Sequence, residues 1–523
     1  MKIILFFLLA CLNCHRGIEK ISDNHNFTCS TCHNGNPAAE TVSLAHSGLI
    51  RNPSAPAYVD DKCGRCHKKE IENVRKSLHS TQAKVIAVTR FLFGAQKTPD
   101  FIYGASDKGG FKLLPEPPPH PETPSEIVDD LLRRKCLRCH INTEGIRSQG
   151  FYRASGCAAC HVVYDNDGIY KGNDMSLRHK RGYPAFHRFV KNIPDVQCMH
   201  CHNGNRVGAD YHGYFEHDYD RAFRSPYPEK IIYGIDFHYL KKDLHAERGL
   251  TCIDCHRGIM NDESVTCESC HGGFNTHPDS RFVNQNVMLT VSGEKLKVPA
   301  FRKDIDGHDE NHRNVECSLC HASWAYGDYG LHLVRIDIPD YYPWRRLILQ
   351  GDPIVTEFLS KQLSKPFEKW DMPVMKDFID GSLKRGLWLM GWSLRRWEII
   401  PMGVNKNGKF SAYRPMYQIF VSYVDSEGYV IMDSEIPIRG DGKVWGSVPF
   451  TPHTTGRGRA CFSCHGSAES LGLGYRLYIR GKPEVVVDSL TILPPAIFPD
   501  SRLLNREEIE KLLKPRSNVY FQD

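Results

Sequence analysis

Twenty cysteines and ten histidines of this 523-residue chain fall into one repeated pattern, Cys-x-x-Cys-His. Five copies lie between Cys136 and His271, and no cysteine is left outside the pattern. Two thiols on one turn of chain can form thioethers with the vinyl groups of a porphyrin, and the adjacent imidazole can ligate the iron. We therefore interpret the ten copies as covalent attachment sites for c-type haem and number them motifs 1 to 10 in chain order.

The residues that this interpretation assigns to the cofactor are two thiols and one imidazole per motif. The haem-binding cysteines are Cys11, Cys14, Cys29, Cys32, Cys63, Cys66, Cys136, Cys139, Cys157, Cys160, Cys198, Cys201, Cys252, Cys255, Cys267, Cys270, Cys317, Cys320, Cys461 and Cys464. The proximal iron ligands are His15, His33, His67, His140, His161, His202, His256, His271, His321 and His465.

Two other uses of paired cysteines have to be weighed. Such pairs can bind structural zinc, and in exported proteins they can form disulfides. Neither use requires a histidine directly after the second cysteine, yet all ten pairs have one although histidine makes up only 26 of the 523 residues. The pattern therefore favours haem over zinc or disulfides.

The second axial ligands are expected among the 16 histidines that lie outside the motif positions. This surplus favours iron with two histidine ligands and a low reduction potential. Methionine, with 11 residues, is the competing ligand and is expected at no more than one or two sites. His120 and His200 are interpreted as bystanders. The distal candidates are His25, His46, His79, His179, His187, His238, His245, His277, His332 and His453.

Composition places few limits on function. The net charge is +6, with 24% charged and 41% hydrophobic residues, which is ordinary for a protein in water. Haem propionates would add negative charge, so the lysines and arginines are better explained as their counter-charges than as a nucleic-acid surface. We expect no nucleic-acid partner.

The first ten residues, MKIILFFLLA, predict a very short secretory signal. Leu8-Leu9-Ala10-Cys11 also resembles a lipobox, and one thiol cannot carry both a lipid and a haem. We favour haem at Cys11, which gives ten haems; a lipid there would leave nine and would be the only membrane attachment. The expected location is the periplasm or the cell surface.

The motif positions suggest five parts: a signal at 1–10, an N-terminal unit with three motifs at 11–135, a dense haem core with six motifs at 136–322, a haem-free α+β insert at 323–460, and the last motif with C-terminal strands and a helix at 461–523. The expected fold class is a multihaem cytochrome c, mainly α with extensive irregular loops around the haems. The insert is the exception.

Local patterns predict several elements that position the motifs. Apolar residues at helical spacing predict a helix over 71–92 that contains His79. Capping signals predict helices that begin at Thr123 and Asn505. In the insert, 344–400 looks helical with a tryptophan-rich segment, 416–433 predicts a β-hairpin, and further strands are expected at 475–480 and 484–488. The tryptophans, Trp388, Trp392 and Trp397, are interpreted mainly as apolar core.

The motifs together with segments such as DLHAERGLTCIDCH and ECSLCHASWAYG resemble the multihaem c-type cytochromes of anaerobic respiration and extracellular electron transfer. The resemblance covers residues 11–335 and 453–470. Related families include pentahaem nitrite reductases and octahaem hydroxylamine oxidoreductases and tetrathionate reductases. In the reductases the active haem typically has a lysine in place of the motif histidine, and no such motif occurs here. The hydroxylamine enzymes mark their active haem with a tyrosine, and 23 tyrosines are present.

The favoured function is an electron carrier between redox partner proteins, a quinol-side donor and a periplasmic or surface acceptor. The alternative is an oxidoreductase with one five-coordinate haem that acts on a small nitrogen or sulfur compound. An open iron distinguishes the two, and motif 10 is the most difficult to supply with a distal ligand because only His453 precedes it closely. The sequence leaves open whether the protein forms a homo-oligomer or filament.

Overall fold

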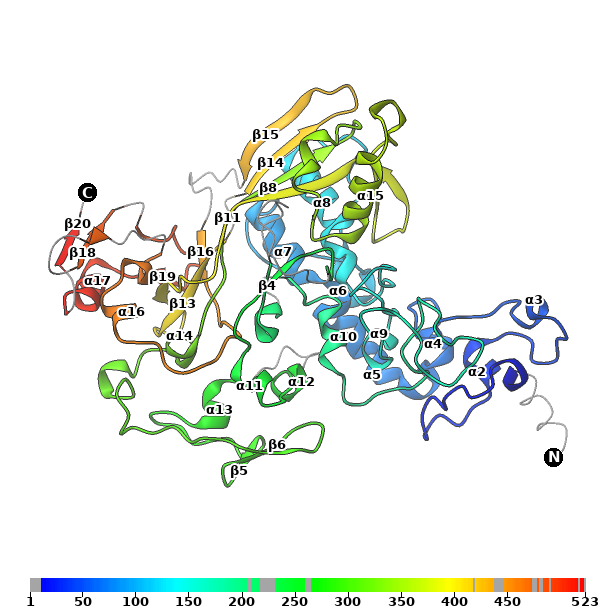
Figure 1. Ribbon diagram of the computed structural model, residues 1–523, viewed down its shortest axis with the longest axis horizontal. Helices are drawn as coiled ribbons and strands as arrows, with labels where there is room; N and C mark the ends of the chain where they lie inside the picture. Colours follow the sequence, from blue (N-terminus) through cyan, green and yellow to red (C-terminus); the bar gives the residue numbers. More distant parts are fainter. Residues whose placement is uncertain are drawn as a thin grey trace.

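The computed structural model describes residues 11–204, 208–216, 231–258, 265–416, 419–436, 446–472, 477–478, 483–488, 491–515 and 518–521. The expected signal at 1–10 lies outside these residues. In Figure 1 the motif-bearing turns are spread along the longest axis of the molecule, from α2 (Cys29–His33) near the N-terminus to α16 (Phe462–His465) near the C-terminus.

Most motifs form a single helical turn, because two thiols three residues apart need no more than one turn to face the same side. Residues 11–14 are helical, and motif 4 forms a 3-10 turn, η2 (Cys136–Cys139), instead of an α-helical one. The other turns are α9 (Ala158–His161), α10 (Asp195–Met199), α12 (Cys252–Cys255), α13 (Cys267–His271) and α14 (Cys317–His321).

Longer helices occur at both ends of the chain. The expected helix over 71–92 is three consecutive helices, because the chain turns at Ser77 and again at Gln82, which adopts a left-handed backbone with φ 53°. Around the motifs are α3 (Val42–Ala45), α4 (Val59–Lys62), α5 (Gly64–Lys76), α6 (Leu78–Thr81), α7 (Ala83–Leu92), α8 (Pro124–Arg134), α11 (Leu244–Glu247), α15 (Pro353–Leu363) and α17 (Arg506–Leu513).

Two four-stranded sheets are formed mainly by the segment between motifs 9 and 10, and one strand of the second sheet comes from after motif 10. The first has the order β11-β8-β14-β15, and β8 and β14 run parallel although the other pairs are antiparallel. Its strands are β8 (Gly327–Ile336), β11 (Leu387–Arg396), β14 (Ile419–Val424) and β15 (Val430–Ile436). The second, in the order β16-β13-β12-β19, contains β12 (Met402–Val404), β13 (Phe410–Met416), β16 (Gly446–Pro449) and β19 (Arg502–Leu503).

Smaller sheets fill the remaining connections. A three-stranded sheet near the C-terminus contains β17 (Leu477–Tyr478), β18 (Pro483–Val487) and β20 (Asn518–Phe521). The others contain β1 (Tyr103–Gly104), β2 (Lys112–Leu113), β3 (Tyr214–Glu216), β4 (Phe237–Tyr239), β5 (Val283–Asn284), β6 (Val287–Leu289), β7 (Lys295–Lys297), β9 (Val374–Lys376) and β10 (Leu383–Arg385).

The expectation of a mainly α fold is wrong. Helices make up only 28% of the structure and strands 20%, arranged in several sheets. The motif turns are too short to raise the helical share, and short strands pair in some of the segments between them, such as β3 with β4. The prediction of helix over 344–400 is wrong in the same way, since α15 is its only α-helix and Leu387–Arg396 is a strand.

Several local predictions are confirmed. Capping boxes begin α8 at Thr123 and α17 at Asn505. The hairpin is β14 and β15, and β17 and β18 occupy the two later strand segments. Trp388 is fully buried and its Nε1 donates to Asp130 at 2.7 Å, as expected for a core residue.

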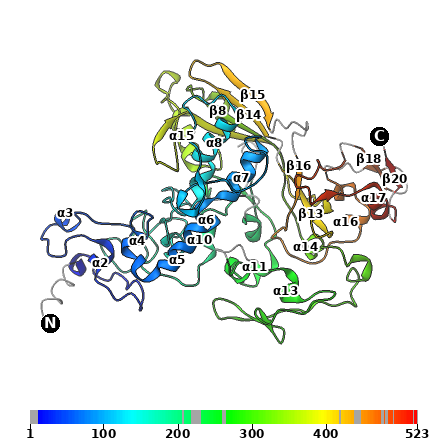
Figure 2. The same ribbon diagram turned by 180° about the vertical axis from the view of Figure 1, so that it is seen from behind.

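The largest apolar core joins segments far apart in the sequence. It combines Ile127, Leu131 and Leu137 with Leu333 and Trp388 of the first four-stranded sheet. Figure 2 shows from behind that α7 and α8 lie beside this sheet. Motif 4, which follows α8 directly, is therefore held against the sheet. The domain boundaries proposed from the sequence stay a prediction.

Candidate haem-binding sites

Eight motif histidines each lie beside a histidine from outside the motifs, with ring centres 6.0 to 6.3 Å apart. The pairs are His15 with His46, His33 with His187, His67 with His25, His202 with His79, His256 with His453, His271 with His245, His321 with His308, and His465 with His312.

This spacing suits two imidazoles on one metal ion. Metal–nitrogen bonds of about 2 Å, with about 1.1 Å from each nitrogen to its ring centre, place the centres roughly 6.2 Å apart. Other ring pairs have centres from 4.6 Å apart, in Phe301 and His308, to 6.3 Å apart, in Phe215 and His238. Shared ligation is thus inferred from the presence of two imidazoles, one of them from a motif, in each of the eight pairs as well as from the spacing. The eight pairs therefore leave the room that one iron between two histidines requires.

The hydrogen bonds of the motif histidines leave Nε2 available for a metal. Nδ1 of His33 donates to the Ile50 carbonyl at 2.8 Å, and Nδ1 of His271 donates to the Pro299 carbonyl at 2.7 Å. His161, His321 and His465 make the same type of contact. A carbonyl can only accept, so Nδ1 carries the proton and Nε2 keeps its lone pair.

Carboxylates hold several other imidazoles. Nδ1 of His15 lies 2.7 Å from Asp174, Nδ1 of His245 lies 2.8 Å from Asp243, and Nδ1 of His312 lies 3.0 Å from Asp309. The hydrogen bond from His15 helps to hold the pKa of Asp174 below its usual value, although burial opposes this shift. A carboxylate on the outer nitrogen orients the ring and makes it a stronger metal ligand.

The sulfur atoms indicate which motifs are neighbours. Thiols of different motifs shift one another's pKa values electrostatically, and these interactions connect nine of the ten motifs in a series. The interacting thiols are Cys11 with Cys29, Cys32 with Cys63, Cys63 with Cys157, Cys160 with Cys198, Cys198 with Cys252, Cys255 with Cys270, Cys267 with Cys317, and Cys320 with Cys464.

Polar side chains fix the spacing between adjacent motifs. The Gln197 amide donates to the carbonyls of Ala159 and Val162, which joins the turns of motifs 5 and 6. Gly156 has φ +66°, and a Cβ there would lie 1.8 Å from the Ser54 carbonyl, so only glycine lets the N-terminal unit approach motif 5 this closely.

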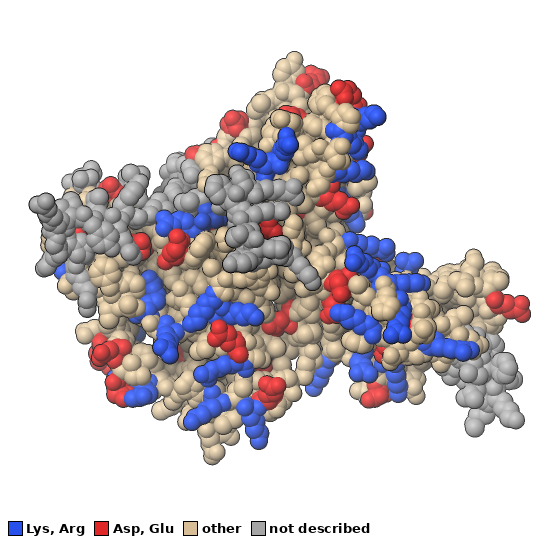
Figure 3. Space-filling model, viewed as in Figure 1, with Lys and Arg blue, Asp and Glu red and all other residues tan. Residues whose placement is uncertain are grey.

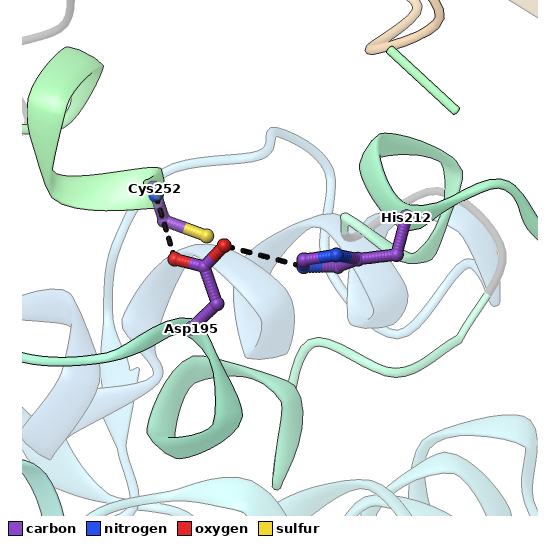
Figure 4. Close-up of side chains that lie close together, drawn as sticks. All are labelled: Asp195, His212 and Cys252. Atoms are coloured by element: carbon purple, nitrogen blue, oxygen red, sulfur yellow. Dashed lines mark hydrogen bonds and ion pairs between the residues drawn. The ribbon is translucent and has the colours of Figure 1, made fainter. Parts of the chain in front are cut away.

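Asp195, His212 and Cys252 form a cluster of three ligand-type side chains whose ligand atoms lie within 4.8 Å of one another (Figure 4). One Asp195 oxygen accepts from the backbone N–H of Cys252 at 2.8 Å, and the other lies 3.5 Å from Nε2 of His212. Asp195 begins the helix of motif 6 and Cys252 begins that of motif 7. The cluster is thus explained as a structural link between motifs 6 and 7.

The distal candidates divide into two groups. His25, His46, His79, His187, His245 and His453 lie beside motif histidines, as listed above. The other four lie elsewhere: His179 and His277 are exposed, Nε2 of His332 shares a hydrogen bond with Ser422, and His238 packs against Trp397.

His308 and His312, which the sequence prediction missed, lie beside the histidines of motifs 9 and 10. His308 precedes its partner closely, but His312 and His465 are far apart in sequence, and no local pattern could have joined them. Of the two expected bystanders, His200 is buried with its nitrogens on the Gly150 and Tyr164 carbonyls, and His120 contacts the Tyr423 hydroxyl.

The histidines of motifs 4 and 5 have no imidazole beside them among the residues that the structure describes. His140 is 3% exposed, its Nδ1 contacts the carbonyl of Leu137, and burial lowers its pKa to about 4. His161 is exposed.

No helix in the described ranges is both long and apolar enough to cross a bilayer. On the face shown in Figure 3, acidic and basic side chains are interspersed. Comparison of the chain with known protein families, with characterised proteins and with solved structures found no match.

Proposed function

We propose that this protein is an exported multihaem c-type cytochrome that carries electrons in anaerobic respiration. The observation that carries the proposal is the set of eight imidazole pairs with ring centres 6.0 to 6.3 Å apart, each containing one motif histidine. A c-type haem, when bound, supplies an iron that exchanges one electron at low potential if two histidines ligate it.

The chain's own residues support this role in three ways. The motif thiols provide two attachment points per site, the hydrogen-bonded Nδ1 atoms fix the imidazole orientation, and hydrogen bonds such as those of Gln197 and Asp195 keep adjacent motifs close together. Adjacent sites are a requirement for a carrier, because electrons must pass between neighbouring centres. The series reaches from motif 1 at one end of the molecule to motif 10 at the other (Figure 1).

Intact mass and optical spectroscopy of the purified protein test the proposal. The expected result is the apoprotein mass plus ten haems, or nine haems and a diacylglycerol on Cys11. Fewer than nine covalent haems would refute it. Carbon monoxide added to the reduced protein measures open iron. The eight paired sites have no vacant position and should bind none, so more than two bound carbon monoxide molecules per protein would contradict a carrier with these eight pairs; motifs 4 and 5 have no second imidazole among the described residues.

A further inference from the structure

Motif 4 occupies a position outside the series that joins the other motifs. Its sulfur neighbour in another motif is Cys201 of motif 6, whose Sγ lies 3.3 Å from the Cys139 carbonyl. Motif 6 also contacts motif 5 through the Gln197 amide, which donates to the Ala159 and Val162 carbonyls, and motif 7 through Asp195, which accepts from the backbone N–H of Cys252. Motif 6 thus has three neighbours, and the series can run from motif 3 through motifs 5, 6 and 7 without motif 4.

The surroundings of motif 4 are buried and rich in cations. Lys135 is 9% exposed and Arg153 is 7% exposed. Nζ of Lys135 has no hydrogen-bond partner in the described part of the chain, and burial lowers its pKa to about 8. Arg138 forms an ion pair with Asp352 at 3.0 Å. Three cations, Lys135, Arg138 and Arg153, and the Asp352 carboxylate thus lie next to motif 4, and the Arg153 guanidinium donates to backbone carbonyls, including that of His140.

The proximal histidine of motif 4 also differs from its counterparts. Among the ten motif histidines, all of which the structure describes, His140 alone is buried. Its Nδ1 contacts a neutral carbonyl, as the Nδ1 atoms of five other motif histidines do. The imidazole pairs of motifs 1, 8 and 10 each include a ring held by a carboxylate, and no such ring lies beside His140 among the described residues.

These differences all act on the reduction potential in the same direction. Reduction removes one positive charge from the site, so nearby cations and a low dielectric favour the reduced form. A carboxylate on the ligand's outer nitrogen has the opposite effect, because it favours the oxidised form. Motif 4 has the cations and the burial and lacks that carboxylate.

We propose that motif 4 is a side branch of the electron path, joined at motif 6, and that its buried cations give it the highest reduction potential of the ten sites. The proposal rests on the proposed function, since it requires haem at the motifs. A buried site of this kind holds one electron beside the main path instead of passing it to a protein partner.

Removing the attachment thiols tests the branch. C136A/C139A is expected to lack one haem by mass and to lose the component with the highest midpoint in a potentiometric titration. The remaining haems should still be reoxidised as one kinetic population after rapid mixing with an acceptor. C198A/C201A removes motif 6, which connects the two halves of the series. The remaining haems of this variant should be reoxidised as two kinetic populations. Loss of a low-potential component in C136A/C139A, or divided kinetics there, would overturn the proposal.

Lys135→Met tests the cationic surroundings in a protein that keeps all ten haems. The expected result is a lower midpoint for the highest-potential component alone, with Lys135→Arg restoring it. Lys365 provides the matched control, because it lies away from the motifs and its Nζ forms an ion pair with Asp371 at 2.8 Å. K365M should shift no reduction midpoint. No shift in K135M, or a shift of a low-potential component, would contradict the inference. An absence of covalent haem in the parent protein would instead refute the proposed function.

Discussion

Replacing His312 with alanine should open a single iron, that of motif 10. The rings of His312 and His465 have centres 6.0 Å apart, and Asp309 orients the His312 ring through Nδ1 at 3.0 Å. Alanine has no nitrogen that could ligate the iron, so the sixth coordination position of the motif 10 iron becomes vacant. The expected gain is one bound carbon monoxide per protein relative to the parent, which changes about one tenth of the Soret absorbance if ten haems are attached.

The assay is a carbon monoxide titration of the dithionite-reduced protein, followed at the Soret band. His332→Ala is the matched control, because His332 is exposed and its Nε2 contacts Ser422 instead of a motif histidine. The control should bind no more carbon monoxide than the parent. If H312A gained no carbon monoxide, or if H332A gained as much, the 6 Å ring spacing would not report axial ligation and the assignment of the pairs would fall.

Two further predictions concern the elements that hold the motifs. Trp388→Phe removes a hydrogen bond to the buried carboxylate of Asp130 and should lower the free energy of unfolding by about 2 kcal/mol, measured by denaturant titration; an unchanged midpoint would show that this bond contributes nothing. Asn505→Ala removes the cap of α17, whose Leu512 carbonyl accepts from Nδ1 of His465. The substitution should lower the free energy of unfolding by about 1 kcal/mol and broaden the motif 10 resonances in NMR spectra. Unchanged resonances in that variant would contradict the link between cap and motif.

Sequence patterns predicted the local features well because their causes are local. The capping boxes at Thr123 and Asn505 and the hairpin of β14 and β15 depend on residues within a few positions of one another. The prediction for 344–400 failed because Trp388 and Trp392 are four residues apart. That spacing lies on one face of a helix but also on one face of a strand, since four is a multiple of the strand period of two. Pairing with β8 decides between the two.

The axial pairs were only partly predictable for a different reason. A surplus of histidines indicates that distal ligands exist, but the partner of each depends on the path of the chain. A histidine that precedes a motif often serves another one: His25 precedes motif 2 and lies beside the histidine of motif 3, and His453 precedes motif 10 and lies beside that of motif 7. Proximity in sequence is therefore a poor guide to ligation.

The long separations within these pairs have a consequence for the order in which the protein matures. A ribosome completes His33 long before His187, and His256 about 200 residues before His453, so an early motif must wait for its second ligand until much more of the chain exists. When both histidines ligate the same iron, the coordination bonds close a loop of chain between them, about 200 residues long for His256 and His453. In the chain-entropy model such a closure, if permanent, disfavours the unfolded chain by about 5 kcal/mol. Later segments would thus complete the sites of earlier motifs, and a chain truncated before His453 would leave a ligand position of motif 7 unfilled.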